Sequence, residues 1–205
     1  MCPVSRRIGD HQPTATAPER ARIVCDDGRT ALIVDGVVQS IDIESATSSD
    51  YWSAMLPDTR PEQTLLLGAG GGTLAAMLVQ RFGPLRVIAV DNDPDVVRLG
   101  RTAFYLAVPG VSVVLADAVQ FVTWCGGRFD YIAVDLFRGN ERPREVAGRP
   151  FLRDLRRIAR PGATIAFNLF QDRRVETTLA RIARVLSPVR RVTAGKNVVT
   201  HYRMR

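Results

Sequence analysis

The sequence has few cysteines, and their positions argue against two kinds of site. The three cysteines are Cys2, Cys25 and Cys125, which are odd in number, far apart and without a CxxC pair. This spacing argues against a disulfide framework and against a zinc site, so we predict no metal. It is typical of a protein kept in a reducing compartment, and we expect a cytoplasmic location.

Long hydrophobic runs are also missing. No apolar stretch reaches the length of about 20 residues that crosses a bilayer, and the first residues lack the apolar core of a signal peptide. We therefore expect no membrane association. With 205 residues, 46% of them hydrophobic, the chain is long enough for one domain with a full core.

Lysine is nearly absent, which affects how the charge is interpreted. The formal net charge is +7, but Lys196 is the only lysine, and the arginines are scattered apart from a concentration between Arg138 and Arg160. Scattered arginines are more typical of a solvated surface than of a nucleic-acid interface. We therefore do not expect a nucleic-acid partner.

One stretch that is present organises the rest, residues 64–78, TLLLGAGGGTLAAML. Three leucines predict a short buried strand, four glycines follow, and Thr73 opens a run of helix formers. Glycine lets a strand turn sharply into a helix and lets the backbone approach a ligand closely. We expect the helix start to offer unpaired N–H groups to that ligand.

A second unit follows at the spacing of a nucleotide-binding site. Residues 86–90, RVIAV, predict another buried strand, which ends in Asp91 about twenty residues past the glycine loop. An acid at this place accepts hydrogen bonds from ribose hydroxyls. The alternative is that Asp91 caps the next helix, with Asn92, Asp93 and Pro94 in an ordinary turn. Loop, strand and acid occurring together favour the ribose interpretation.

The remaining chain alternates strands and helices. We expect a disordered tail over residues 1–19, a β-hairpin or three-stranded ribbon over 20–45, and a Rossmann-like domain over 46–205. The alternation predicts an α/β fold with a doubly wound, largely parallel sheet and right-handed crossovers. Near the C-terminus we expect a mobile loop over 139–150 and a helix over 151–160 that Pro161 and Gly162 terminate.

Acids follow three of the expected strands. Asp91, Asp117 and Asp135 should all lie at the sheet edge that carries the glycine loop, where doubly wound sheets bind their ligands. Asp135 is the candidate general base, and a strand-end acid bonded to nearby backbone is an equal alternative.

The 139–148 part of the expected loop, with Arg138, Arg142 and Arg144, is a candidate substrate lid, because arginine holds carboxylates and phosphates. For any single arginine, a solvated loop is the stronger alternative.

The order of the segments resembles a known family. LLLGAGGGTL, VIAVDNDPDVV, VVLADAVQFV and FDYIAVDLF are similar to the S-adenosylmethionine-dependent methyltransferases. LIVDGVVQS before them and GKNVVTHYR after them resemble the spermidine synthase-like (polyamine aminopropyltransferase-like) branch, so the resemblance covers residues 22–205. It implies S-adenosyl-L-methionine or decarboxylated S-adenosylmethionine as cofactor, a small-molecule acceptor and a homodimer.

The resemblance also implies roles for individual residues. Gly68, Gly70 and Gly72 would bound the methionine and ribose portion of the cofactor. Gln39 would reach over the cofactor from the N-terminal side, and Asp135 occupies the position of the family's catalytic aspartate.

Two further strand ends would hold the nucleoside. Asp91, with Asn92 beside it, would bind the ribose hydroxyls. Asp117 and the backbone of Ala118 would read the adenine amino group.

The chain departs from the polyamine synthases at their substrate positions. Their glycine loop has an aspartate where this chain has Gly70, and their second catalytic-loop aspartate is matched by Arg138. Their Tyr-His pair is approximately Trp52-Ser53, with Tyr51 one place out of register. Tyr51 and Trp52 are candidate walls of the substrate pocket, although aromatic residues near a helix more often belong to the core.

These departures decide the predicted reaction. Polyamine substrates carry two or more ammonium groups, which carboxylates must hold, and an arginine in their place adds repulsion. We therefore predict a methyltransferase that acts on a small molecule. The alternatives are an aminopropyltransferase and a catalytically inactive cofactor-binding homologue.

Two other enzyme classes fit the sequence less well. A nucleic-acid methyltransferase is disfavoured because Asp135-Leu136-Phe137 replaces the usual Asn/Asp-Pro-Pro-aromatic run. An NAD-dependent dehydrogenase rests on the glycine loop alone, and neither His11 nor His201 is placed to relay a proton.

Overall fold

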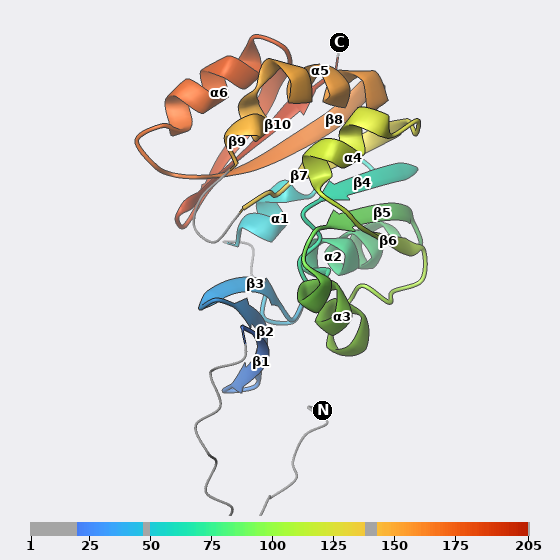
Figure 1. Ribbon diagram of the computed structural model, residues 1–205, viewed down its shortest axis with the longest axis vertical. Helices are drawn as coiled ribbons and strands as arrows, with labels where there is room; N and C mark the ends of the chain where they lie inside the picture. The colour runs from blue at the N-terminus through green and yellow to red at the C-terminus, as the bar shows by residue number, and fades with distance from the viewer. Residues whose placement is uncertain (1–19, 47–49, 138–142, 205) are drawn as a thin grey trace, which may run out of the picture.

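The structure is a computed structural model that describes residues 20–46, 50–137 and 143–204. Figure 1 shows a large sheet with helices packed on both faces and a smaller sheet formed by the N-terminal segment. The predicted tail over residues 1–19 lies outside the described part of the chain, as do Arg138 and Arg142.

The N-terminal segment forms an antiparallel sheet of β1 (Ala21–Asp26), β2 (Arg29–Val34) and β3 (Val37–Ile41), so the expected ribbon has three strands. Its turns contain Asp27 and Asp35 at positive φ, each followed by a glycine, as two-residue hairpin turns require. Such a small sheet needs external packing to be stable. Leu32 and Val34 provide it by burying themselves against Val96.

The large sheet has seven strands in the order β6-β5-β4-β7-β8-β10-β9. The central strands β4 (Gln63–Leu67) and β7 (Phe129–Val134) pair in parallel, and β5 (Arg86–Asp91), β6 (Val111–Leu115) and β8 (Ala159–Phe170) continue this direction. The doubly wound α/β fold is therefore confirmed. The chain reverses its direction of winding between β4 and β7, which makes that junction the topological switch point.

The last two strands make the sheet mixed. β10 (Asn197–Arg203) runs antiparallel to both β8 and β9 (Ser187–Ala194). A hairpin joins β9 and β10, so no crossover helix is needed between these two strands.

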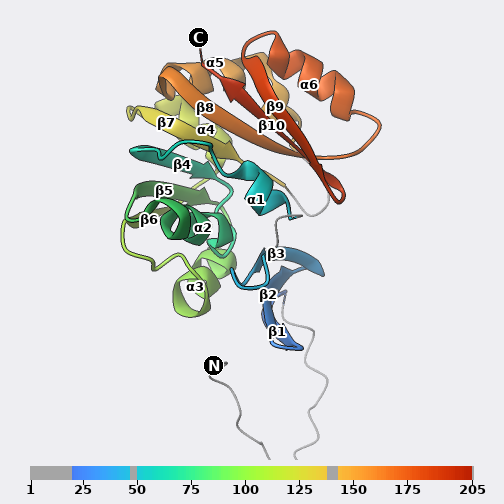
Figure 2. The ribbon, with the colours of Figure 1, turned by 180° about the vertical axis from the view of Figure 1, so that it is seen from behind.

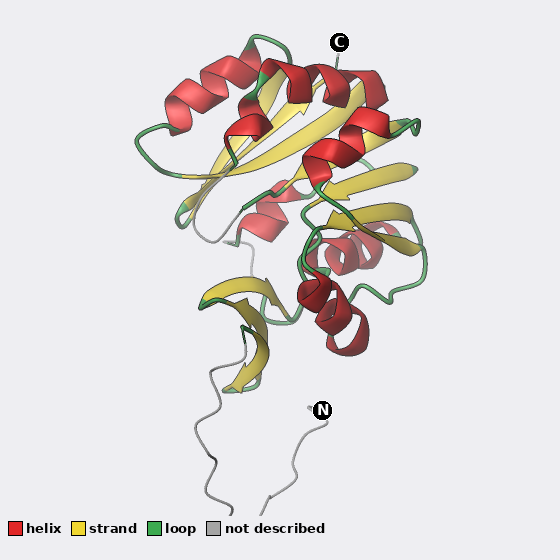
Figure 3. Ribbon diagram, in the orientation of Figure 1, coloured by secondary structure: helices red, strands yellow, loops and turns green. Residues whose placement is uncertain are grey.

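Helices cover both faces of the sheet (Figures 2 and 3). α1 (Tyr51–Met55) and α2 (Thr73–Phe82) contribute to one core cluster, and α4 (Ala118–Trp124), α5 (Arg149–Ile158) and α6 (Val175–Ala183) contribute to the other. The remaining helix, α3 (Pro94–Ala103), contacts β5 and β6 of the large sheet and β1 and β2 of the small one. Among the described helices, none combines the length and hydrophobicity needed to cross a bilayer.

Two predictions from the sequence, for the loop over residues 139–150 and for the helix end at Pro161 and Gly162, are wrong. The described part of the expected mobile loop contains a 3-10 helix, η1 (Arg144–Ala147), because Val146 and Ala147 are buried in the core. Pro161 and Gly162 do not separate helix from strand but lie inside β8, where its pairing with β7 shifts register. The backbone of Gly162 has a φ of 78°, which suits the irregularity.

Candidate functional site

A cavity of about 1100 Å³ lies at the carboxyl ends of the central strands, between the glycine loop and the N-terminal sheet. It holds nearly all the described residues that the sequence predicted for the site. Its lining includes Gln39, Tyr51, Trp52, Gly68, Gly70, Asp91, Asn92, Asp117, Ala118 and Asp135. Its volume is at the upper end of the range of about 300–1,000 Å³ that is usual for small-molecule and cofactor sites.

The backbone N–H groups of the glycine loop are paired within the protein. Ala69 and Gly70 donate their backbone N–H groups to Oδ2 of Asp91 at 3.0 and 2.9 Å, and Gly71 donates to Oγ of Ser40 at 2.7 Å. The N–H groups at 68 and 72 donate to backbone carbonyls. These five donors are therefore not free for a phosphate, while the expectation for the first turn of α2, which starts at Thr73, stays a prediction.

Close packing explains the glycines at 68 and 70. A Cβ on Gly68 would lie 2.0 Å from the carbonyl oxygen of Asp135, so this glycine lets the ends of β4 and β7 meet at the switch point. A Cβ on Gly70 would lie 2.7 Å from the carbonyl oxygen of Gln39. Both residues have positive φ, which also favours glycine.

Gly72 lies just outside the cavity lining. It precedes α2 as a left-handed N-cap with a φ of 97°. A Cβ there would come within 3.0 Å of the backbone of Tyr105 and Leu106. Packing therefore explains this glycine, and its contact with the cofactor stays a prediction.

Asp91 lies at the end of β5 and holds the loop. Besides Ala69 and Gly70, its carboxylate accepts a bond from the N–H of Asp93, and burial raises its pKa. The alternative in which Asp91 caps α3 is wrong, since Asp93 is the N-cap and accepts from Asp95 and Val96. The ribose contact of Asp91 stays a prediction.

Asp117 is the N-cap of α4. Its Oδ1 atom accepts hydrogen bonds from the N–H groups of Val119 and Gln120 at 2.9 and 3.0 Å. Ala118, the first residue of the helix, lines the cavity beside it. These contacts place a carboxyl group and a helix start at the cavity wall, and their proposed contact with adenine stays a prediction.

Asp135 is held by two side-chain donors at the end of β7. Nδ2 of Asn168 donates to its Oδ1 at 2.8 Å, and the Tyr51 hydroxyl forms a second hydrogen bond. Asn197 in turn donates to the Oδ1 of Asn168 at 2.9 Å, which orients the Asn168 amide so that its NH₂ group faces Asp135. Burial raises the pKa of Asp135 to about 6 and outweighs the two donors, which lower it.

Two phenylalanines follow this polar pair on adjacent strands. Phe137 comes two residues after Asp135, and Phe170 comes two residues after Asn168. Their ring centroids are 4.4 Å apart, and both half-buried side chains line the cavity. The cavity therefore has acids at the ends of β5 and β6, whereas at the ends of β7 and β8 it combines the Asp135 carboxylate with the Asn168 amide and two aromatic rings.

The short helix α1 brings aromatic residues to the same end. Trp52 is buried in the core and also reaches the cavity, and its ring lies 4.2 Å from that of Tyr51. Arg190 ties the end of this helix to β9, because its Nη2 donates to the carbonyl oxygens of Ala54 and Leu56 at 3.1 and 3.0 Å. Trp52 thus belongs to the core and also forms part of the cavity wall, as the two interpretations of the sequence each proposed.

Among the described residues, no group of three or more histidine, cysteine or acidic side chains is arranged to hold a metal ion. His201 does not line the cavity; its Nε2 atom lies 2.7 Å from the Ala54 carbonyl oxygen and 2.8 Å from Arg190. Its pKa is lowered by burial.

The chain is similar in sequence to polyamine aminopropyltransferases. No protein-family model matches the chain. A polyamine aminopropyltransferase of Chromobacterium violaceum is 28% identical over 128 residues, which are 61% of this chain and 49% of that protein. A second, of Pyrobaculum calidifontis, is 28% identical over 159 residues, 69% of this chain and 54% of that protein. The chain spans about half the length of these curated relatives.

Solved structures share the fold. A probable spermidine synthase of Corynebacterium glutamicum has a TM-score of 0.75 at 19% identity, over 89% of this chain and 76% of that one. The N-methyltransferase NodS of Bradyrhizobium japonicum, in complex with S-adenosylhomocysteine, has a TM-score of 0.59 at 19% identity, over 73% and 81% of the two chains. The chain has the methyltransferase fold and is spermidine-synthase-like.

Sequence reasoning missed three residues of the cavity lining. Asn168 and Phe170 lie outside the quoted motifs, and Asn197 lies in GKNVVTHYR, where it was given no role. One signal was available, because Asn168 interrupts the apolar strand IAFNLF. A buried asparagine in such a strand needs polar partners, which suggests a site.

Proposed function

We propose that this spermidine-synthase-like protein is an S-adenosylmethionine-dependent transferase that methylates a small molecule. One observation carries the proposal: the glycine loop closes its own N–H groups on Asp91 and Ser40, while acids stand at the neighbouring strand ends. A dinucleotide would need free donors for its phosphates. A cofactor that joins a nucleoside to a cationic sulfonium, without phosphates, fits a cavity lined with acidic residues.

The lining residues fit an adenosyl cofactor. Gly68 and Gly70 leave their side of the cavity without side chains, and Gln39 covers the loop from β3. We assign Asp91 and Asn92 to the ribose, with about one lone-pair position of the Asp91 carboxylate left for a hydroxyl after its three backbone bonds.

The base would lie at the next strand end. Asp117 caps α4 through Oδ1 and stands in the cavity wall beside Ala118. We assign this pair to the adenine amino group, as the family resemblance implies.

Asp135 is the catalytic residue in this proposal. When bound, S-adenosylmethionine supplies a methyl carbon that its positive sulfur has already activated. Asp135 accepts the proton that the acceptor loses, and its pKa of about 6 suits a base working near neutral pH. Asn168 and Tyr51 hold the carboxylate in place, and the buried Trp52 helps to keep water out.

Gly70 favours methyl transfer over aminopropyl transfer. The resemblance matches this position to an aspartate that faces the aminopropyl group in polyamine synthases. In this chain any Cβ would collide with the Gln39 carbonyl oxygen, 2.7 Å away, so the aspartate could be accommodated only if β3 moved. The loop therefore lacks the carboxylate that would hold a cofactor ammonium group.

Aminopropyl transfer remains the second candidate, since the curated relatives are named polyamine aminopropyltransferases. The test is to incubate the full chain with S-adenosylmethionine or decarboxylated S-adenosylmethionine and a panel of amines. We expect S-adenosylhomocysteine as the product. Methylthioadenosine formed only from the decarboxylated cofactor would overturn methyl transfer in favour of the second candidate.

A third outcome would identify a catalytically inactive homologue. In that case S-adenosylhomocysteine would give a calorimetric binding curve, and no acceptor in the panel would be converted. Absence of any heat with S-adenosylhomocysteine would contradict the cofactor assignment itself.

We also propose that the protein is a cytoplasmic homodimer. Cys25 and Cys125 form no disulfide, in keeping with a reducing compartment, and Val38 on β3 is exposed on the small sheet. Light scattering at several protein concentrations tests the dimer. A monomer mass throughout would contradict it.

A further inference from the structure

We propose that the acceptor is an arylalkylamine, that is, one amine nitrogen joined by a short linker to an aromatic ring. This inference rests on the proposed transferase function and names its acceptor class. The nitrogen would bind at Asp135, and the ring would lie against the shelf formed by Phe137 and Phe170.

The shelf is an apolar surface built into the sheet edge. Phe137 lies just after β7, and Phe170 is the last residue of β8. Their ring centroids are 4.4 Å apart, and the ring planes are tilted by 46°. Both are only half-buried, so they present ring surface to the cavity instead of filling the core. Aromatic rings pair best with another ring in an offset or tilted arrangement, with centroids about 4.5–7 Å apart.

The carboxylate beside the shelf has capacity for one amine. Asp135 accepts bonds from Asn168 and Tyr51, which leaves about two of its four lone-pair positions for a ligand. Phe137 lies two residues further along the chain, and both residues line the same cavity. A nitrogen at the carboxylate can therefore be joined by a short linker to a ring at the shelf.

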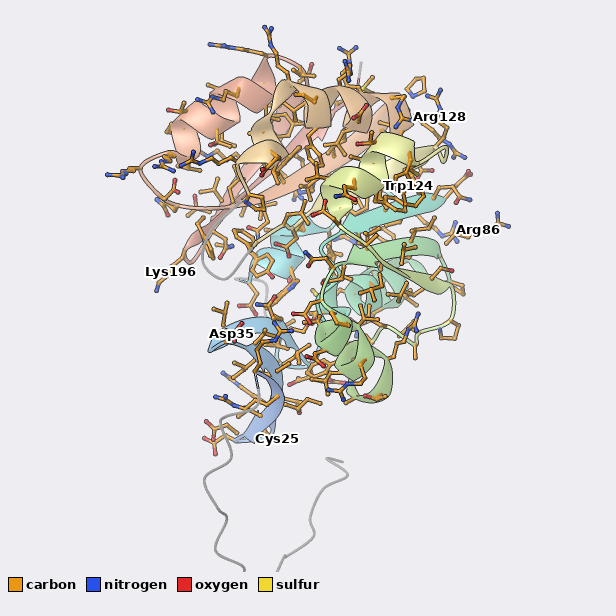
Figure 4. All side chains as sticks on the ribbon, in the orientation of Figure 1. Cys25, Asp35, Arg86, Trp124, Arg128 and Lys196 are labelled. Atoms are coloured by element: carbon orange, nitrogen blue, oxygen red, sulfur yellow. The ribbon has the colours of Figure 1, made fainter. Side chains whose placement is uncertain are left out.

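The apolar shelf disfavours an aliphatic diamine. Glu145 of η1 and Lys196, in the turn between β9 and β10 (Figure 4), line the cavity with opposite charges, but both are exposed, so water screens their effect on a second ammonium group. The partly buried Asp135 carboxylate can satisfy one ammonium group, and a second would have to lie against phenylalanine.

The transfer balances with these groups. The bound ammonium first loses one proton to Asp135, which frees the nitrogen lone pair. The nitrogen then forms a bond to the methyl carbon while the bond from that carbon to sulfur breaks, and the electron pair of the broken bond stays on sulfur. The products are a secondary N-methylammonium and S-adenosylhomocysteine, and the proton leaves Asp135 for solvent.

Calorimetry on the full chain saturated with S-adenosylhomocysteine tests the inference without turnover. The probes are 2-phenylethylamine, n-hexylamine and 1,4-diaminobutane. We expect 2-phenylethylamine to bind at least about 10-fold more tightly than the diamine, and about 2- to 10-fold more tightly than n-hexylamine, because ring pairing strengthens binding beyond the burial of apolar area.

A matched pair of variants locates the binding. Phe170→Leu should weaken 2-phenylethylamine about 3- to 10-fold. Phe82→Leu, which changes another half-buried phenylalanine outside the cavity lining, should leave the affinity unchanged. Phe137→Leu replaces the first variant if Phe170→Leu does not fold.

The outcomes separate this inference from the function it rests on. Equal or tighter binding of 1,4-diaminobutane, or no effect of either shelf variant, overturns the arylalkylamine while S-adenosylhomocysteine still binds. If S-adenosylhomocysteine does not bind, the proposed function fails and the inference fails with it.

Discussion

At the scale of single residues, the protonation of Asp135 links stability to pH. Its folded-state pKa of about 6 lies above the ordinary value of 3.8, because burial penalises the charged form. The protonated form therefore stabilises the fold fully below about pH 4, and this contribution is lost as the pH rises to 6.

The isosteric change Asp135→Asn tests this linkage. The variant should be more stable than the wild type at pH 7 by about 1–3 kcal/mol, and the advantage should shrink toward pH 4. Urea unfolding at pH 4, 5, 6 and 7 measures it. An advantage that does not change with pH would show that Asp135 does not titrate in this range. The same variant should abolish turnover while S-adenosylhomocysteine still binds.

Asn168 is a positioning residue for the same carboxylate. The variant Asn168→Asp would place a second carboxylate about where the amide donates at 2.8 Å, and two such groups cannot both ionise easily. We expect the apparent pKa in the profile of kcat/KM to rise above 6. Gln80→Glu makes the same exchange on the exposed side of α2 and should leave the profile unchanged. An unshifted profile in Asn168→Asp would remove Asn168 from the chemistry.

At the scale of elements, α1 depends on its anchors. A helix of five residues is not stable alone, and α1 carries both Tyr51 and Trp52 to the cavity. Arg190 holds its last carbonyl groups, Tyr131 donates its hydroxyl to the Met55 carbonyl oxygen, and both partners come from the large sheet. The helix is thus positioned by tertiary contacts rather than by its own sequence.

Neighbouring arginines provide a matched test of this dependence. Arg190→Met removes the donor to the Leu56 carbonyl oxygen and one of two contacts of the Ala54 carbonyl oxygen, and it should cost about 1–3 kcal/mol of unfolding free energy. Arg191→Met removes only an exposed ion pair with Glu176, worth about 0–1 kcal/mol. Urea unfolding compares them. Equal losses would mean that the Arg190 contacts do not anchor α1.

At the scale of the whole molecule, the two sheets meet at the glycine loop. Ser40 of β3 accepts from Gly71, and Thr73 at the start of α2 both donates to and accepts from the backbone of Ile41. Arg20, which precedes β1, pairs with Asp93 at 2.7 Å. The N-terminal sheet therefore helps to hold the glycine loop in its conformation.

Removing one hydroxyl should expose this coupling. Ser40→Ala leaves the buried N–H of Gly71 unpaired, and we expect a loss of about 1–3 kcal/mol in stability together with weaker S-adenosylhomocysteine binding. Thr102→Ala, which loses an exposed hydroxyl bonded within α3, is the control and should change neither. Unchanged cofactor affinity in a less stable Ser40→Ala variant would separate the sheet contact from the site.

The sequence by itself determined the elements and their order. Runs of apolar residues indicate which segments are buried. Because strands alternate with helices, and crossovers between parallel strands are right-handed, the winding of the sheet follows from the order of the elements. This was enough to bring Gly68, Asp91, Asp117 and Asp135 to one edge. It misjudged Pro161, because a bulge in β8 absorbs a residue that usually ends an element.

Only the tertiary structure decided what those residues contact. The acceptors for the glycine-loop donors come from Ser40 and Asp91, which lie 31 and 21 or 22 positions away in the sequence. The pairing of Asp135 with Asn168 follows from the register of β7 against β8. Local patterns predict burial and periodicity, whereas hydrogen-bond partners across strands depend on register and on how the sheets pack, which no local pattern encodes.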